Sequence, residues 1–301
     1  MAADKDDLWE TMTAHPGFGA GNVLDLRPAA AFRRGHPPGA VNLPLPDNPD
    51  RDAVPALLET AVPSIFLPPR HEPLLVLALP GQHPGECAAA LAARGREDVL
   101  GLAFPDPAAG GVAPGPLATG SGRDMLWRPD PWLLTHQNLL PPPAAGPVLD
   151  LGCGSGRSAV WLALRGYRVV GIDRDPEALA LGARLAEACA VRCDFREADL
   201  RRPEAVPAGP FAAVLDFRYL ERDLLAIIPR LLVRGGTALV RTFRDAPGYG
   251  GHPHPRHRLA PYELLRAFPR PGFEALAHEE SFDPDGRPAA GIVARRTHAP
   301  L

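Results

Sequence analysis

The sequence predicts an α/β fold divided into two compact parts. In the second half of the chain, apolar strand-like segments alternate with helix-like segments, which is typical of parallel strands in a doubly wound sheet. The 301 residues are enough for two domains of ordinary size. A stretch rich in proline and glycine interrupts the chain. We therefore predict a first domain over residues 1–104, a linker over 105–146 and a second domain over 147–301.

Composition narrows the classes of protein to consider. A formal net charge of −3 gives no electrostatic reason to expect a nucleic-acid partner. The four cysteines form no C-x-x-C pair, so we expect neither a disulfide scaffold nor a metal site. The start of the chain is acidic and polar, and no apolar run reaches the roughly 18 residues of a membrane span. We expect a cytoplasmic protein with a small-molecule substrate and no membrane partner. Its oligomeric state stays open.

The elements of the second half follow from apolar periodicity and from caps. Asp130-Pro131 suits a helix start, so we predict a helix near residues 130–140 inside the linker. Apolar segments predict seven strands, the last two as an antiparallel pair, at 147–151, 168–172, 191–195, 211–215, 237–243, 273–279 and 289–295. Helices are predicted at 157–165, 175–188, 220–232 and 261–268.

The strongest chemical pattern is D-x-G-x-G-x-G over residues 150–156, where an apolar strand enters a loop with three glycines and a helix follows. Glycine permits positive φ and lets a ligand approach the backbone, and the helix start offers free N–H groups. A dinucleotide fingerprint would place its third glycine at position 157, which is Arg157, so a nicotinamide enzyme is disfavoured. Acids also end the next two strands, at Asp173 and Asp199. One such acid could be a solvated strand end, but three in succession favour a nucleotide-like ligand.

This pattern resembles the first motif of the S-adenosylmethionine (SAM)-dependent methyltransferases with a Rossmann-like fold. The resemblance implies that Gly152, Gly154 and Gly156 lie against the methionine and ribose parts of the cofactor. It implies that Asp150 organises the loop and the methionine amino group, while Asp173 accepts hydrogen bonds from the ribose hydroxyls. Asp199 and Leu200 would lie against the adenine. Cys153 belongs to the same cofactor loop, and we expect its side chain to pack beneath it.

Further segments are similar to the tellurite-resistance-like branch of small-molecule methyltransferases. They include GRSAVWLA at 156–163, FRYL at 217–220 and the tract at 254–264. The chain lacks the N-P-P-Y motif of amino-group nucleic-acid methyltransferases. We therefore expect a small acceptor that is soft or anionic, such as a thiol or a selenium or tellurium oxyanion.

No catalytic residue stands out in the sequence. The substrate-side candidates follow the fourth and fifth strands, where ligands bind in open α/β sheets. They are Arg218, Tyr219, Arg244 and His254. These arginines and histidines could equally belong to a solvated loop.

The first domain resembles the rhodanese family. The segments VLDLR at 23–27 and FRRGHPPGAVN at 32–42 fit that family's D-x-R and G-H-x-P-G-A-x-N motifs. The nucleophilic cysteine of the family falls here on Ala78, and two prolines remove amide donors from the loop that should stabilise a thiolate. We predict an inactive domain in which Cys87 does not substitute and His36 is structural.

Three alternatives remain beside a SAM-dependent methyltransferase. The protein could be a non-catalytic SAM-binding protein, or it could serve as a scaffold. The third alternative, an active sulfurtransferase, conflicts with Ala78 at the nucleophile position.

Overall fold

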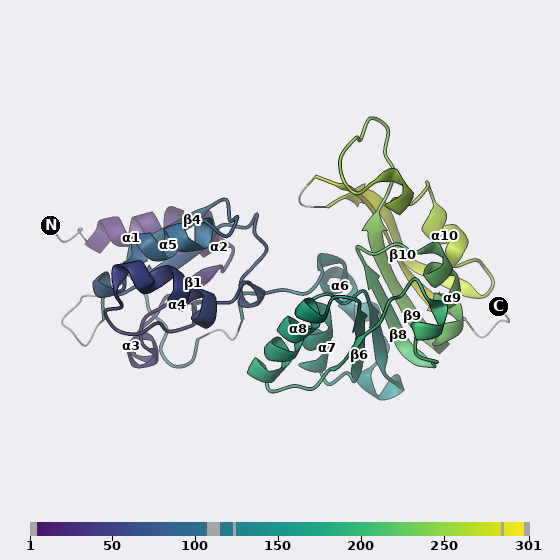
Figure 1. Cartoon of the computed structure of the whole chain (residues 1–301), viewed down its shortest axis with the longest axis horizontal. Coiled ribbons are helices and arrows are strands. Elements are labelled where there is room, and N and C mark those ends of the chain that lie inside the picture. The colour runs from purple at the N-terminus through teal and green to yellow at the C-terminus, as the bar shows by residue number, and fades with distance from the viewer. Residues whose placement is uncertain (1–4, 107–114, 123–124, 284–285, 298–301) are drawn as a thin grey trace. The chain divides into compact units, whose positions relative to one another are not determined.

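A computed structural model describes residues 5–106, 115–122, 125–283 and 286–297 of the chain (Figure 1). The chain divides into two compact units, Met1–Arg128 and Pro129–Leu301. Each unit has its own sheet and is described by itself. Among the described residues, no helix is long and apolar enough to cross a membrane.

The first unit contains a four-stranded parallel sheet with strand order β2-β1-β3-β4. Its strands are β1 (Val23–Asp25), β2 (Val41–Asn42), β3 (Leu74–Ala78) and β4 (Val99–Ala103). Its helices are α1 (Lys5–Ala14), α2 (Pro16–Gly19), α3 (Ala29–Arg34), α4 (Val54–Ala61) and α5 (Pro84–Ala92). Short 3₁₀ helices are η1 (Arg51–Ala53), η2 (Ser64–Phe66) and η3 (Pro80–Gln82).

This first sheet is buried on both faces, which explains the continuous apolar run of β3. Leu75 and Leu77 pack with Met12 of α1 and Phe32 of α3. The alternate residues of β3 form a second cluster with α4 and α5 on the opposite face. Because side chains alternate along a strand, one strand can serve both clusters.

The second unit contains a seven-stranded sheet with order β10-β11-β9-β8-β5-β6-β7. Its strands are β5 (Val148–Leu151), β6 (Val169–Asp173), β7 (Asp194–Glu197), β8 (Phe211–Phe217), β9 (Leu232–Phe243), β10 (Phe273–Phe282) and β11 (Pro288–Arg296). Its helices are α6 (Pro131–His136), α7 (Arg157–Ala163), α8 (Pro176–Ala188), α9 (Arg222–Leu231) and α10 (Glu263–Ala267). Short 3₁₀ helices are η5 (Gln137–Leu139), η6 (Pro143–Ala145), η7 (Pro203–Ala205) and η8 (Pro255–His257).

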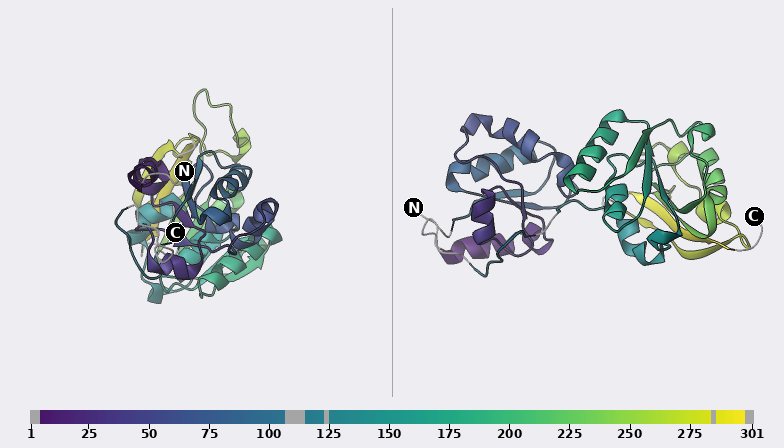
Figure 2. Two further views of the ribbon diagram at one scale, coloured as in Figure 1. Left: turned by 90° about the vertical axis from the view of Figure 1, so that its left-hand side faces the viewer. Right: turned by 90° about the horizontal axis from the view of Figure 1, so that it is seen from below.

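The strand pairing confirms the predicted α/β class and the seven strands. Strands β5 to β9 pair in parallel, whereas β11 pairs antiparallel with both β9 and β10. Figure 2 shows the yellow β10 and β11 side by side. The helices α6, α7 and α8 lie on one side of the sheet, and α9 and α10 lie on the other (Figure 1).

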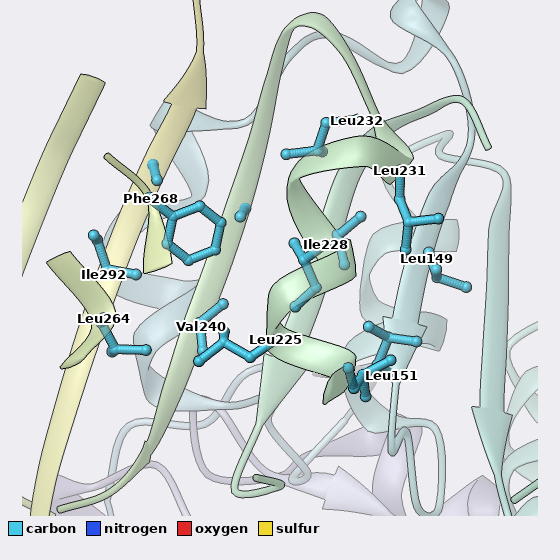
Figure 3. Packing of buried hydrophobic residues seen from close by; sticks show 14 of the residues in the cluster. Leu149, Leu151, Leu225, Ile228, Leu231, Leu232, Val240, Leu264, Phe268 and Ile292 are labelled. Atoms are coloured by element: carbon cyan, nitrogen blue, oxygen red, sulfur yellow. The ribbon is translucent and has the colours of Figure 1, made fainter. Parts of the chain in front are cut away.

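The largest apolar cluster joins α9 and α10 to the sheet. Leu225, Ile228 and Leu231 of α9 point toward the strands that carry Leu149 and Val240 (Figure 3). This amphipathic packing holds β5 and β8 side by side, so their carboxyl ends have a fixed position.

One expectation needs correction. The third strand begins at Asp194, and not at Val191, because α8 ends through a hydrogen bond from the Val191 amide to the Ala186 carbonyl and Ala190 has a positive φ of 53°. The strand β7 is the exposed edge of its sheet, so it lacks the apolar pattern that would have located it.

Of the segment predicted as a linker, residues 107–114 and 123–124 lie outside the described residues, and the described parts belong to one unit or the other. Their boundary lies between Arg128 and Pro129. Leu126 packs into the core of the first unit. The helix α6 is part of the second unit, since Trp132 is buried and donates from its ring nitrogen to the Ile292 carbonyl at 3.4 Å. Leu126 and Trp132 thus anchor the described residues on either side of the boundary.

Candidate functional site

A cleft of about 290 Å³ opens where the carboxyl ends of β5, β6, β7 and β8 meet. The strand order reverses between β5 and β8, and ligands of open α/β sheets bind at such a reversal. Residues that follow all four strands line the cleft: Gly152, Asp173, Arg174, Ala198, Leu200, Phe217, Arg218 and Tyr219.

The glycine loop between β5 and α7 has its three glycines at positive φ, 65° at Gly152, 51° at Gly154 and 67° at Gly156. A Cβ at Gly156 would lie 2.4 Å from the ring of Phe195, so this position is closed by packing. A Cβ at Gly154 would meet no heavy atom within 4 Å. Gly154 is therefore the point of the loop where a ligand has room to approach the backbone.

Asp173 fixes the shape of this loop from the neighbouring strand. Its carboxylate accepts hydrogen bonds from the amide of Gly154 at 2.7 Å and from the amide of Asp175 at 3.0 Å. The side chain also lines the cleft. Each carboxylate oxygen can accept a second hydrogen bond, so Asp173 can hold the loop and still bind hydroxyl groups.

Asp150 lies beneath the loop and is only 2% exposed. Its Oδ2 has no hydrogen-bond partner among the described residues. Burial, with the nearby charges of Asp130 and Asp173, raises the pKa of Asp150 to about 8. A buried carboxyl oxygen without a partner is costly, and a cation beside it would remove that cost.

A second buried acid, Asp216, lies at the end of β8 and was not among the predicted cofactor residues. It is 1% exposed, and its Oδ1 also lacks a partner among the described residues. Burial and the charge of Asp150 hold the pKa of Asp216 well above its usual range. The signal was present, because an aspartate interrupts the apolar run FAAVLDF.

The two adenine candidates are placed differently. Leu200 is 4% exposed and lines the cleft. Asp199 does not line it, and its carboxylate is bound by both Nε and Nη2 of Arg201, with a shortest distance of 2.7 Å. This hydrogen bonding lowers the pKa of Asp199 to about 2.

Cys153 packs beneath the glycine loop. A Cβ at Gly171 would lie 3.0 Å from its Sγ, so the thiol fills the space over β6. Burial and the nearby charges of Asp150 and Asp173 raise the pKa of this thiol. Cys153 is therefore a neutral packing group and not a nucleophile.

A larger cavity of about 680 Å³ adjoins this cleft. Arg174, Arg218 and Tyr219 line both of them. Arg218 is a non-glycine residue at a φ of 60°, which is strained, and strain of this kind is common at functional sites. Tyr219 would contact any Cβ at Gly152, and burial and nearby acids raise its pKa to about 12.

The structure brings only part of the predicted substrate-side set together. Arg244 does not line the cavity; its Nη1 donates to the carbonyl of Asp245, and its guanidinium lies 5.8 Å from the ring of Phe282. His254 caps η8 by accepting from the Arg256 amide, and it is exposed. The cavity is lined instead by Thr242, Arg256 and His257, which belong to the same segment of the chain.

In the first unit, the loop after β3 is filled by the side chain of one of its own residues, Gln82. Ala78 is fully buried where a rhodanese nucleophile would lie. The buried Gln82 donates to the carbonyls of Leu26, Leu45 and Pro46 at 3.0, 3.1 and 3.2 Å. Its Oε1 accepts from the amide of Leu79. The amides of residues 82 and 83 donate within the loop, so they do not converge on a bound anion.

The remaining rhodanese-like motif residues have structural contacts. Arg27 binds both oxygens of Asp25, and both side chains are fully buried. His36 stacks on Phe32 with ring centroids 3.8 Å apart. Burial raises the pKa of Cys87 to about 11, so it offers no thiolate in place of Ala78.

No group of three histidine, cysteine or acidic side chains within the described ranges could hold a metal ion.

Comparison with known families assigns both regions. Residues 148–236 match the family model of a methyltransferase domain, and residues 5–103 match that of a rhodanese-like domain. The chain thus carries a methyltransferase domain and a rhodanese-like domain, as the motifs predicted.

Two of the curated relatives are methyltransferases that match part of the chain. The release factor glutamine methyltransferase of Geobacter sulfurreducens is 33% identical over 122 residues, which are 38% of this chain and 43% of that protein. The ubiquinone biosynthesis O-methyltransferase of Xanthomonas campestris is 34% identical over 105 residues, 33% of this chain and 44% of that protein. The chain spans less than half of the length of these relatives.

Among solved structures, TehB from Haemophilus influenzae has a TM-score of 0.47 and 20% identity, covering 55% of this chain and 61% of that one.

Proposed function

Since the chain carries a methyltransferase domain, we propose that it transfers a methyl group from SAM to a small-molecule acceptor. One observation supports this above the others. The cleft at the strand reversal gathers Gly152, Asp173 and Leu200, three residues from three loops that the motif pattern had assigned to one cofactor. The match to the methyltransferase family covers the strands that build this cleft.

The residues present fit SAM in charge and in space. Gly154 leaves room for a ligand at the loop, and Asp173 offers oxygens to ribose hydroxyls. The partnerless oxygen of Asp150 suits the ammonium group of the methionine part. Leu200 provides an apolar wall for the adenine, whereas Asp199 would need the acceptor sites that Arg201 leaves open.

SAM would supply an activated methyl group, so the chain has to orient the acceptor and exclude water. Tyr219 lies against Gly152, where the cofactor cleft meets the larger cavity. With a pKa of about 12 it stays a neutral phenol near pH 7, and it can donate a hydrogen bond but does not act as a base. This favours acceptors that need no base, such as thiols and selenium or tellurium oxyanions.

The same proposal includes a cytoplasmic location, which the four free cysteines support. We propose that the rhodanese-like domain serves as a folding partner or binding module, because its former nucleophile loop is filled.

Isothermal titration with SAM and S-adenosylhomocysteine tests the cofactor assignment. Asp173→Ala removes a charged acceptor for two hydroxyls, and we expect the affinity to fall about 100-fold. The matched control is Glu187→Gln, an exposed acid on α8, which should bind both ligands like the wild type. Absence of binding to the wild type at millimolar SAM would contradict the proposed function.

A further inference from the structure

The larger cavity carries information on the acceptor that the cofactor cleft does not. Its volume of about 680 Å³ lies in the range of sites that enclose drug-sized organic molecules. A selenite-sized ion with three oxygens needs roughly the space of three to four water molecules, about 100 Å³ at 30 Å³ each. An acceptor of that size would leave most of the cavity unfilled.

The wall of the cavity is rich in arginine, but the five arginines differ in their partners. Arg201 is bound by Asp199, and Arg222 is bound by Glu263 and by two backbone carbonyls. These two are structural. The other three are Arg174, Arg218 and Arg256.

Within the described parts of the chain, these three arginines have no carboxylate within hydrogen-bonding distance. The nearest acidic oxygens to Arg218 are those of Asp283 at 3.7 Å and Asp130 at 3.9 Å. The Nε of Arg256 donates to the ring of His257 at 2.8 Å. The acids on the wall are Glu221 and Asp223, so arginines outnumber acids there. This arrangement favours an anionic ligand group.

The residues that line the cavity fall into two groups. Arg218 and Tyr219 are shared with the cofactor cleft, so the methylated atom must lie beside them. Arg256 and His257 line only the larger cavity. Leu220, Phe243 and Pro253 provide apolar surface on the same wall.

Arg256 and His257 belong to a loop with a fixed shape. The guanidinium of Arg258 is 4% exposed and donates to the carbonyls of Pro253 and Tyr249 at 2.8 and 2.9 Å, and also to the Gly251 carbonyl. It reaches Asp245 as well, at 3.3 Å. These bonds tie both limbs of the loop together, so Arg256 is presented on a preformed wall and not on a free tail.

Thr242 provides a further polar group on the wall of the cavity. It lines the cavity, is 2% exposed, and its Oγ1 has no hydrogen-bond partner among the described residues.

We propose that the methyl acceptor is an organic anion. Its carboxylate or phosphate group binds Arg256 and His257, its apolar body lies against Leu220 and Phe243, and its methylated atom lies beside Tyr219. This inference rests on the proposed function, because it places the reacting atom where the cavity meets the cofactor cleft. In such a ligand the anionic group and the reacting atom are separate, so the thiols of the proposed function remain acceptors, whereas its selenium and tellurium oxyanions do not.

The test uses the full chain saturated with S-adenosylhomocysteine, and the ligands are 1-naphthyl phosphate, 1-naphthoate, uncharged 1-naphthol, inorganic phosphate and selenite. Titration calorimetry should show at least one naphthyl anion binding 10-fold or more tightly than 1-naphthol and than both inorganic ions. The better of the two anions identifies the group as a phosphate or a carboxylate.

Variants locate the binding. Arg256→Gln should remove the preference for the anion over 1-naphthol, whereas Arg256→Lys should keep most of it. The control Arg184→Gln changes an exposed arginine on α8 and should behave like the wild type. All variants should bind S-adenosylhomocysteine normally.

Three results would overturn the inference. The first is equal binding of selenite and the naphthyl anions. The second is normal binding of S-adenosylhomocysteine with no naphthyl anion bound. The third is anion binding that Arg256→Gln leaves unchanged. Loss of S-adenosylhomocysteine binding by the wild type would instead reject the proposed function itself.

Discussion

Two loops of this chain connect the same kinds of elements, but one is filled by a side chain and the other leaves room for a ligand. Each joins the end of a buried parallel strand to a helix, β3 to α5 in the first unit and β5 to α7 in the second. In the first loop, the side chain of Gln82 occupies the centre and pairs with three carbonyls and an amide. In the second, Gly154 is open and Asp150 retains an oxygen without a partner.

The difference concerns where the polar groups find partners. A loop that no longer binds anything can satisfy its groups internally and gain stability from doing so. A loop that binds a ligand has to leave some groups for that ligand, at a cost to the stability of the free protein. Gln82 and Asp150 illustrate these two outcomes in one molecule.

The largest effect on stability is expected from emptying the filled loop. Gln82→Ala removes the hydrogen bonds that this side chain makes with three carbonyls and one amide, of which the Leu26 carbonyl still accepts from the Leu45 amide, and we expect the first unit to lose roughly 2–4 kcal/mol of unfolding free energy. Urea denaturation measures this, and titration calorimetry should show unchanged SAM affinity. Glu59→Ala, which removes an exposed acid of α4, is the control. A variant as stable as the wild type would show that Gln82 merely occupies space.

A smaller, pH-dependent effect on the unfolding free energy is expected from Asp150 beneath the open loop. Burial raises the pKa of Asp150 from 3.8 to about 8, so between these pH values the folded state binds more protons than the unfolded state. The unfolding free energy of the free protein should therefore fall as the pH rises through this window. Asp150→Asn removes that fall and should be more stable than the wild type at pH 8.5 by roughly 1–3 kcal/mol.

Melting temperatures measured from pH 4 to pH 9 check this prediction. The advantage of Asp150→Asn should disappear near pH 4, and Glu187→Gln should follow the wild type throughout. The same variant should bind SAM more weakly, since an amide does not carry the charge that attracts an ammonium group. Parallel pH profiles for the wild type and Asp150→Asn would contradict the assignment of the buried charge.

The smallest effect is expected from restoring the missing nucleophile. Ala78→Cys should give no turnover of thiosulfate to thiocyanate, because position 78 is fully buried and the loop amides are used internally. A colorimetric thiocyanate assay measures this. Turnover above that of the wild type would show that Gln82 leaves the centre of the loop. The first loop could then bind a ligand as the second does, and the two loops would differ in sequence but not in what they can bind.

Sequence patterns located the strands and helices whose side chains are buried. The segments around Val148 and Phe211 were predicted to within a few residues because both faces of these strands are apolar. The edge strand β7 was placed three residues too early, since its exposed residues carry no apolar period. The helix expected near residues 130–140 corresponds to α6, in which Trp132 is buried.

Some residues of the candidate site could be predicted from the sequence and others could not. Glycine spacing and strand-end acids pointed to Gly152 and Asp173, because the position of a parallel strand end is fixed by topology. Arg244 and His254 could not be placed, since the path of the loop after β9 is set by Arg258 and its carbonyl contacts. The role of Gln82 was equally hidden, because three of its partners lie 36 to 56 residues earlier in the chain.

The hydrogen bond between the Gly154 amide and Asp173 has a consequence for the speed of ligand capture. It fixes the conformation of the loop before the cofactor binds. The loss of chain entropy therefore occurs on folding and not on association. Cofactor uptake should then follow simple second-order kinetics, with an observed rate that rises linearly with ligand concentration and no slow isomerisation after encounter.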